Sequence, residues 1–198
     1  YVETIKSLTK EVAAATGSKK AELVLKNAQI VNVFTQSVET GDIAIEGGYI
    51  VGIGNYEGIT EKDLGGAYVC PGFLDGHIHI ESSMTSPGEF ERAVVPHGTT
   101  AVITDPHEIA NVAGTAGIRF MMQSAKKLNL DVYFMLPSCV PATDLDESGA
   151  ELLAADLEPF YIEEKVLGLA EVMNAYGVTH GDKDCLEKLI QARSLRKA

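Results

Sequence analysis

Residues 72 to 84, GFLDGHIHIESSM, place two of the chain's five histidines one residue apart at the end of an apolar run. Side chains at positions i and i+2 of a strand project from the same face, so His77 and His79 can reach one metal ion. Neutral imidazole is a good ligand for zinc, iron, manganese or nickel. Asp75 and Gly76 just upstream suit the support of such a site. The alternative is a strand end with two solvated polar residues.

From Pro71 onward, apolar runs typical of buried strands alternate with segments of helical pattern. We expect strands at 72–80, 99–105, 131–138 and 166–173, and helices at 87–98, 110–129, 148–164 and 185–198. Such alternation predicts an α/β fold with a parallel sheet, open or closed as a barrel.

Four βα units fill residues 71–198, whereas a complete TIM-like (β/α)8 barrel takes about 250 residues. Half a barrel would leave the edge of its fourth strand unpaired. We therefore expect these residues to be the first four units of a truncated barrel, which further residues or a partner chain would complete.

Two smaller segments precede the α/β region. Apolar residues at Val2, Ile5, Leu8 and Val12 predict an amphipathic helix within residues 1–20. Residues 21–70 contain short β-rich runs separated by Gly-Asp and Gly-Gly turn signals, which predict a small antiparallel β domain.

The composition limits the class of partner. Acidic residues outnumber basic ones 28 to 16, a formal net charge of −12, which disfavours nucleic acid and anionic lipid as ligands. No run of about 18 apolar residues is present, so we expect no membrane span. The three cysteines have no CxxC spacing and predict reduced thiols in a cytoplasmic protein.

A second polar cluster comes after the expected strand at 99–105, where the sequence continues as Asp105, Pro106, His107 and Glu108. Ionisable residues at the carboxyl end of a parallel strand are placed to line a ligand site. The alternative is helix initiation, with Asp105 as the cap, Pro106 at the first position and Glu108 at the third. Both interpretations can hold at once.

Glu171 interrupts the apolar run VLGLAEVMN, residues 166–174. A buried carboxylate is costly unless it is paired or bound to a metal, so this position favours a metal ligand. The alternative is a surface glutamate in a misassigned strand. The Pro-rich loop 137–151 comes after the third strand and can line a pocket at the same end of the sheet, or simply connect.

Taken together, these motifs resemble a known family. PGFLDGHIHI resembles the strand-one signature of the amidohydrolase superfamily. HIESSM, GTTAVITDPHEIANV, FMLPSCVPAT and GLAEVMN, in that order, closely resemble the amino-terminal portion of bacterial and archaeal adenine deaminases. The resemblance runs from about residue 20 to the end of the chain.

The resemblance implies a hydrolase that converts adenine to hypoxanthine and ammonia, with two divalent ions (manganese, iron or zinc) at the mouth of a (β/α)8 barrel. His77 and His79 would ligate one metal, and Glu171 would bridge both. Many superfamily members bridge with a carbamylated lysine instead, but Lys165 precedes the fourth strand. The family's later histidine ligands and its strand-eight catalytic aspartate have no counterpart in this sequence, so the catalytic residue is unassigned.

The resemblance also yields expectations for the pocket. Glu81, Ser82 and Ser83 directly follow the histidine pair and would form its wall. The cluster of Asp105, His107 and Glu108 would contact the substrate or support the metals. Adenine would be the small-molecule partner, and the protein would form a homo-oligomer or need the missing carboxyl-terminal half.

Two rival functions stay open at this point. One is a hydrolase like acetylglucosamine-6-phosphate deacetylase, which also has an HxH pair and a glutamate ligand but needs a basic phosphate grip. The other is an inactive fragment that only binds metal or assembles with a partner.

Overall fold

The computed structural model describes residues 4–143 and 145–195, and the chain divides into two compact units, Tyr1–Pro71 and Gly72–Ala198. The ends of two predicted helices, residues 1–3 and 196–198, lie outside the described residues, as does residue 144 of the Pro-rich loop. No helix in the described ranges has the length and apolar character needed to cross a membrane.

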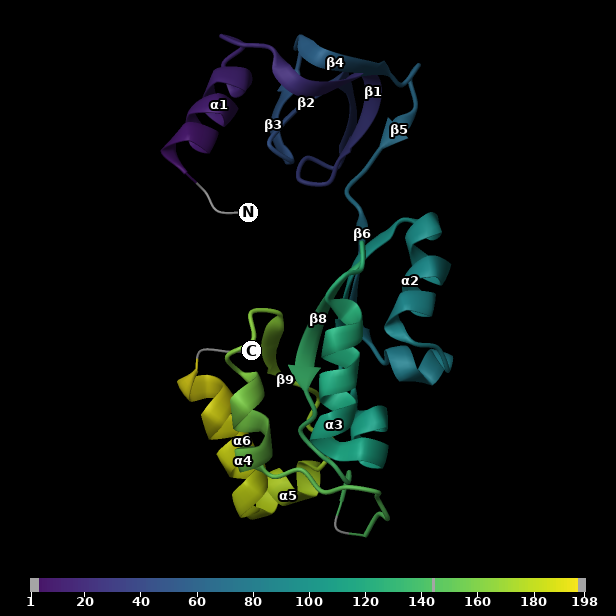
Figure 1. The fold of residues 1–198 in the computed structure, drawn as a ribbon, viewed down its shortest axis with the longest axis vertical. Coiled ribbons are helices and arrows are strands. Elements are labelled where there is room, and N and C mark those ends of the chain that lie inside the picture. The colour runs from purple at the N-terminus through teal and green to yellow at the C-terminus, as the bar shows by residue number, and fades with distance from the viewer. Residues whose placement is uncertain (1–3, 144, 196–198) are drawn as a thin grey trace. The chain divides into compact units, whose positions relative to one another are not determined.

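The first unit is a small sheet with one helix (Figure 1). Its elements are α1 (Ile5–Ala15), β1 (Ala21–Asn32), β2 (Ser37–Glu46), β3 (Tyr49–Gly54), β4 (Gly58–Asp63) and β5 (Tyr68–Val69). The strand order is β3-β2-β1-β4, and β5 also pairs with β1. β1 pairs antiparallel with β2 but parallel with β4 and β5, so the prediction of a purely antiparallel unit is wrong. After β3 the chain passes to the other side of β1, a crossover that local sequence does not encode.

Thr4 is the N-cap of helix α1, and its side chain accepts a hydrogen bond from the Ser7 N–H (3.1 Å). The apolar positions that predicted this helix do not form its buried face: Ile5 is 89% exposed and Val12 is 54% exposed. The helix instead packs through Ala14, which joins Ala21, Val24 and Ala44 in a small core. The helix is therefore confirmed, whereas its expected apolar contact face is not.

A charged network holds β1 to β2 in this unit. The Asp42 carboxylate pairs with Lys26 and accepts hydrogen bonds from the backbone N–H groups of Asn27 (3.1 Å) and Tyr56 (3.4 Å). Burial raises the pKa of Asp42, but these hydrogen bonds outweigh burial and hold the pKa below its ordinary value. The ionised carboxylate therefore stabilises the fold above about pH 4, and this stabilisation is lost as the pH falls further.

We expect Asp42→Ala to lower the free energy of unfolding by roughly 2–4 kcal/mol at pH 7, because it leaves a partly buried ammonium and two N–H groups without their acceptor. The free energy of unfolding should also fall less steeply as the pH is lowered below about 4, because the variant lacks the carboxylate that is protonated there. Chemical denaturation followed by far-ultraviolet circular dichroism at several pH values measures both. Glu57→Ala is the matched control, because the Glu57 side chain forms an exposed ion pair with Lys20 (3.1 Å). Equal effects of the two substitutions would contradict the prediction.

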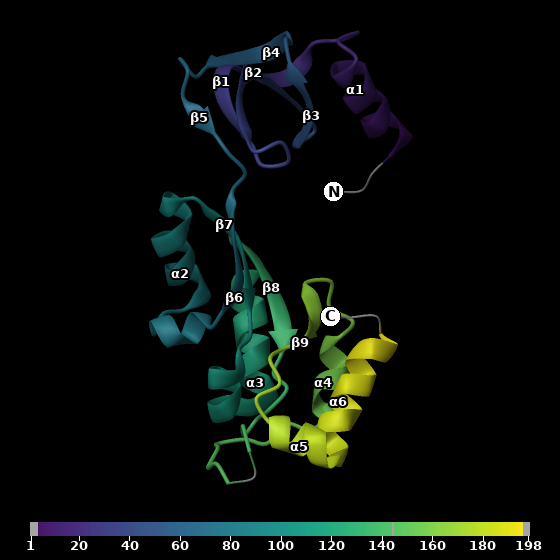
Figure 2. The ribbon, with the colours of Figure 1, turned by 180° about the vertical axis from the view of Figure 1, so that it is seen from behind.

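The second unit confirms the predicted α/β class, with a parallel sheet in the order β6-β7-β8-β9 (Figures 1 and 2). Its strands are β6 (Phe73–Ile78), β7 (Thr99–Thr104), β8 (Asp131–Leu136) and β9 (Val166–Leu169). Its helices are η1 (Ile80–Ser83), α2 (Pro87–Val94), η2 (Val95–His97), α3 (His107–Ala125), α4 (Ala154–Leu157), η3 (Glu158–Phe160), α5 (Ala175–His180) and α6 (Lys183–Ser194). One apolar core joins the strands to the helices, with α3 packed on β8 and α6 on β9.

The helix predicted at 148–164 is much shorter in the structure, where only α4 and η3 are helical. The preceding residues bond to other segments instead: the Gly149 N–H donates to the Asn111 carbonyl (2.8 Å) and the Leu152 N–H to the Val140 carbonyl (2.9 Å). Pro159 also lacks the N–H that a continuing helix requires. Helix α5 was not predicted.

Candidate metal centre

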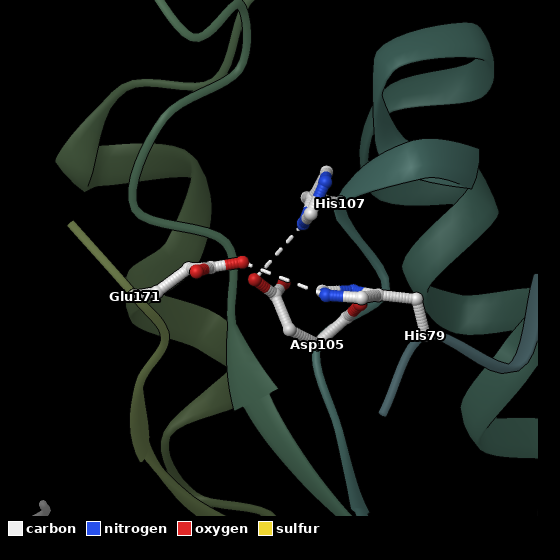
Figure 3. Close-up of side chains that lie close together, drawn as sticks. All are labelled: His79, Asp105, His107 and Glu171. Atoms are coloured by element: carbon white, nitrogen blue, oxygen red, sulfur yellow. Dashed lines mark hydrogen bonds and ion pairs between the residues drawn. The ribbon is translucent and has the colours of Figure 1, made fainter. Parts of the chain in front are cut away.

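The carboxyl ends of three of the four parallel strands bring the predicted ligands together (Figure 3). His77 lies in β6 and His79 just after it, while Asp105 follows β7 and His107 opens α3. Glu171 lies beyond the end of β9. Parallel strands present their carboxyl ends at one edge of the sheet, so residues almost a hundred positions apart become neighbours.

Two imidazoles and one carboxylate converge at this edge. The Nε2 atoms of His77 and His79 are 3.2 Å apart. They lie 3.6 and 3.5 Å, respectively, from Oε1 of Glu171. Three atoms with lone pairs held this close need a shared proton or cation to offset their mutual repulsion.

A main-chain hydrogen bond orients His79. Its Nδ1 lies 2.8 Å from the carbonyl oxygen of Asp105. A carbonyl only accepts, so Nδ1 carries the hydrogen, and in the neutral ring the lone pair is on Nε2, the atom that lies beside Glu171. Metal-ligating histidines usually have such an outer hydrogen bond, which fixes the tautomer.

Asp105 and His107 form a second pair beside the first (Figure 3). Oδ2 of Asp105 lies 3.0 Å from Nδ1 of His107, and the His107 ring packs edge-on against His79 with ring centroids 4.5 Å apart. Asp105 is only 1% exposed, and its Oδ1 has no hydrogen-bond partner among the described residues. Burial raises the pKa of Asp105, and the hydrogen bond to His107 opposes that rise.

The chemistry of this cluster fits a divalent cation. His79, Asp105, His107 and Glu171 each offer one ligand atom, and these atoms all lie within 4.8 Å of one another. Imidazole nitrogen and carboxylate oxygen are ligands for zinc, manganese and iron. The buried, unpartnered Oδ1 of Asp105 would also gain from a nearby positive charge.

The structure corrects one expectation about Glu171. The sequence places it inside a buried strand, but β9 ends at Leu169 and the Glu171 side chain is 45% exposed. The expectation of a buried carboxylate is therefore wrong, although the carboxylate does lie against both histidines.

The residues expected to form the pocket wall are largely engaged with other groups. Oε1 of Glu81 accepts the N–H of Ile109 in the first turn of α3 (3.2 Å), while its Oε2 is buried without a hydrogen-bond partner among the described residues. The Ser82 hydroxyl donates to Oε1 of Glu108 (2.5 Å). The Ser83 hydroxyl donates to the carbonyl of Ile80 within its own turn (2.6 Å).

The alternative of helix initiation by Asp105 is not what the structure adopts. Pro106, not Asp105, occupies the N-cap position of α3 and makes no capping hydrogen bond, whereas Glu81 from the preceding turn accepts the Ile109 N–H in the first turn of the helix. Glu108 does lie in the first turn of the helix, where a negative charge is favourable.

The Pro-rich loop 137–151 lines a cavity of about 540 Å³ between itself and α6. The cavity lining includes Ser138, Cys139 and Asn174, but none of the metal-centre residues. Ser138 and Cys139 also bond to the segment 171–174, through the Glu171 carbonyl and the Asn174 N–H, and the sequence analysis did not single out these two residues. Their signal in the sequence was their position after β8, at the edge where the predicted ligands lie.

Over most of its length the chain is similar to proteins named adenine deaminase. The chain is 56% identical over 187 residues to an adenine deaminase of Bacillus pumilus (strain SAFR-032), covering 94% of this chain and 32% of that protein. It is 54% identical over 191 residues to an adenine deaminase of Geobacillus kaustophilus (strain HTA426), covering 96% and 33%. The chain thus spans about a third of the length of these relatives.

Solved structures give the same fold. A dihydroorotase superposes with a TM-score of 0.52 at 19% identity, over 90% of this chain and 50% of that one. The atrazine chlorohydrolase TrzN from Arthrobacter aurescens TC1, solved with zinc, gives a TM-score of 0.52 at 15% identity, over 71% and 42%. The pattern of the Amidohydrolase family matches residues 68–196, which include every residue of the candidate metal centre, and the chain belongs to that family.

Proposed function

We propose that the protein to which this chain belongs hydrolyses adenine to hypoxanthine and ammonia. The observation that carries the proposal is the convergence of His77, His79 and Glu171 within 3.2–3.6 Å, in a chain more than half identical to proteins named adenine deaminase. The reaction replaces the amino group at C6 of the purine with oxygen from water.

In this proposal, His77 and His79 would hold one divalent cation, and Glu171 would be a ligand shared with a second, the metals being manganese, iron or zinc. When bound, such cations supply a hydroxide nucleophile near neutral pH and neutralise negative charge that develops on the substrate. The carbonyl of Asp105 accepts a hydrogen bond from Nδ1 of His79, which leaves the lone pair of Nε2 available to ligate a metal.

The remaining polar residues at this edge would serve the substrate or support the metals. His107 and Asp105 lie beside the ligands, and Glu108 and Ser82 are joined to each other next to them. A flat, weakly charged purine needs hydrogen-bonding partners of this kind. Glu81 would act mainly by joining the turn after β6 to the first turn of α3, and Ser83 by holding that turn itself, since Glu81 accepts the Ile109 N–H and Ser83 donates to the Ile80 carbonyl.

The direct test uses the polypeptide encoded by the complete gene. The protein is stripped with a chelator, reloaded separately with Mn²⁺, Fe²⁺ or Zn²⁺, and assayed for ammonia release from adenine. We expect stripping to abolish ammonia release and at least one metal to restore it, because the ligand set requires a cation to be productive. Acetate release from acetylglucosamine-6-phosphate, with no ammonia from adenine, would replace the proposal with the deacetylase alternative.

A further inference from the structure

The polypeptide that carries Glu171 leaves the sheet before it reaches the metal centre. β9 ends at Leu169, and the Ala170 N–H still donates to the Leu136 carbonyl (2.7 Å) as an extension of the strand pairing. Glu171 itself belongs to no strand, and its side chain is nearly half exposed. A carboxylate on such a segment needs another means of holding its position, because metal ligation tolerates displacements of only about 0.5 Å.

Two residues that follow the neighbouring strand β8 hold this segment in position. Ser138, two residues beyond the end of β8, is 4% exposed, and its hydroxyl donates a short hydrogen bond to the carbonyl oxygen of Glu171. Cys139 is equally buried, and its Sγ accepts the N–H of Asn174 (3.3 Å). The two adjacent residues thus hold the segment 171–174 at both of its ends.

The Ser138 and Cys139 contacts hold different parts of the segment 171–174. The Asn174 side chain also accepts the Gly177 N–H (2.7 Å) as the cap of α5, so the Cys139 contact serves the start of that helix as well. The Ser138 contact is made to the peptide of the ligand residue itself. Ser138 is therefore the residue whose loss would move the carboxylate most directly.

We propose that Ser138 is a positioning residue for Glu171, and that its hydroxyl sets the affinity of the centre for divalent metal without touching metal or substrate. The inference rests on the proposed role of Glu171 as a ligand. Outer hydrogen bonds of this kind typically contribute about 10- to 100-fold to metal affinity. Since the Ser138 hydroxyl donates to a carbonyl, any side chain at position 138 with a donor in the same place can hold the Glu171 peptide.

The test compares three variants of the complete protein. Ser138→Ala removes the donor, Ser138→Thr keeps it, and Ser148→Ala removes a hydroxyl of the same loop that bonds Asn111 instead of Glu171. Ser138 lines the cavity between this loop and α6, so threonine is the conservative substitution at this position. Competition with a chelator measures the affinity of each metal-free protein for Mn²⁺, and thermal unfolding without metal measures stability.

We expect Ser138→Ala to bind Mn²⁺ about 10- to 100-fold more weakly, and Ser138→Thr and Ser148→Ala to bind it like the wild type. If Ser138→Ala lowers only the unfolding temperature and leaves Mn²⁺ affinity unchanged, the hydroxyl is merely structural and the inference is wrong. If the wild type binds none of Mn²⁺, Fe²⁺ and Zn²⁺ in the same competition assay, the proposed metal centre and the inference are both wrong. If it binds Mn²⁺ but releases no ammonia from adenine, the proposed substrate alone falls, because the affinity comparison does not depend on adenine.

Discussion

Replacing Glu171 by glutamine in the complete protein is expected to lower kcat/KM for adenine by about 10³-fold or more. The substitution keeps the shape of the side chain but removes the charge that lies 3.5–3.6 Å from both imidazole nitrogens. A neutral amide oxygen is a weaker ligand than a carboxylate, so bound metal should fall together with activity. Steady-state assays of ammonia release and elemental analysis of the purified variant measure the two losses.

Glu164→Gln is the matched control, because Glu164 is exposed just before β9 and at the opposite end of that strand from Glu171. It should retain the metal content and kcat/KM of the wild type. A Glu171→Gln protein that keeps both its metal and its activity would remove this carboxylate from the centre and leave the two histidines without their partner.

His79→Ala is expected to cause a loss of similar size, about 10³-fold in kcat/KM, with loss of metal. His79 contacts every other part of the cluster: Nε2 lies beside His77 and Glu171, Nδ1 bonds to Asp105, and the ring packs on His107. Its removal takes away one ligand and the support of the others. The measurements are the same as for Glu171→Gln.

His97→Ala provides the comparison for this variant. His97 is an exposed histidine of the same unit, but it precedes β7 and so lies at the amino end of the sheet, away from the ligands. Near-normal metal content and turnover are expected for it. If His79→Ala behaved in the same way as His97→Ala, the assignment of the centre to this edge of the sheet would be untenable.

Features set by backbone periodicity could be predicted from the sequence. The two-residue repeat of a strand places the side chains of His77 and His79 on one face, and the structure brings their nitrogens together. The alternation of buried strands with helices predicted a parallel sheet, and the structure has one, in the sequential order that βα connections favour. Neither inference required knowledge of distant contacts.

Features set by contacts between distant segments could not be predicted. Gly149 and Leu152 give their N–H groups to Asn111 and Val140 instead of to a helix, a choice that local propensity does not register. The strand before Glu171 ends early, and a serine just beyond the neighbouring strand holds the Glu171 peptide in place. Pairing of β4 and β5 with β1 likewise depends on the path of the chain in space.

The hydrogen bond that orients His79 ends on a peptide carbonyl, so the tautomer of the neutral ring is set by a group that every amino acid at position 105 would supply. The Asp105 side chain bonds to a different ring, that of His107. Residue 105 therefore makes two separate contributions: its main-chain carbonyl orients His79, and its side-chain carboxylate pairs with His107. Saturation mutagenesis at this codon can vary the charge next to His107 while the donor pattern of the neighbouring ligand stays constant, which makes the two effects experimentally separable.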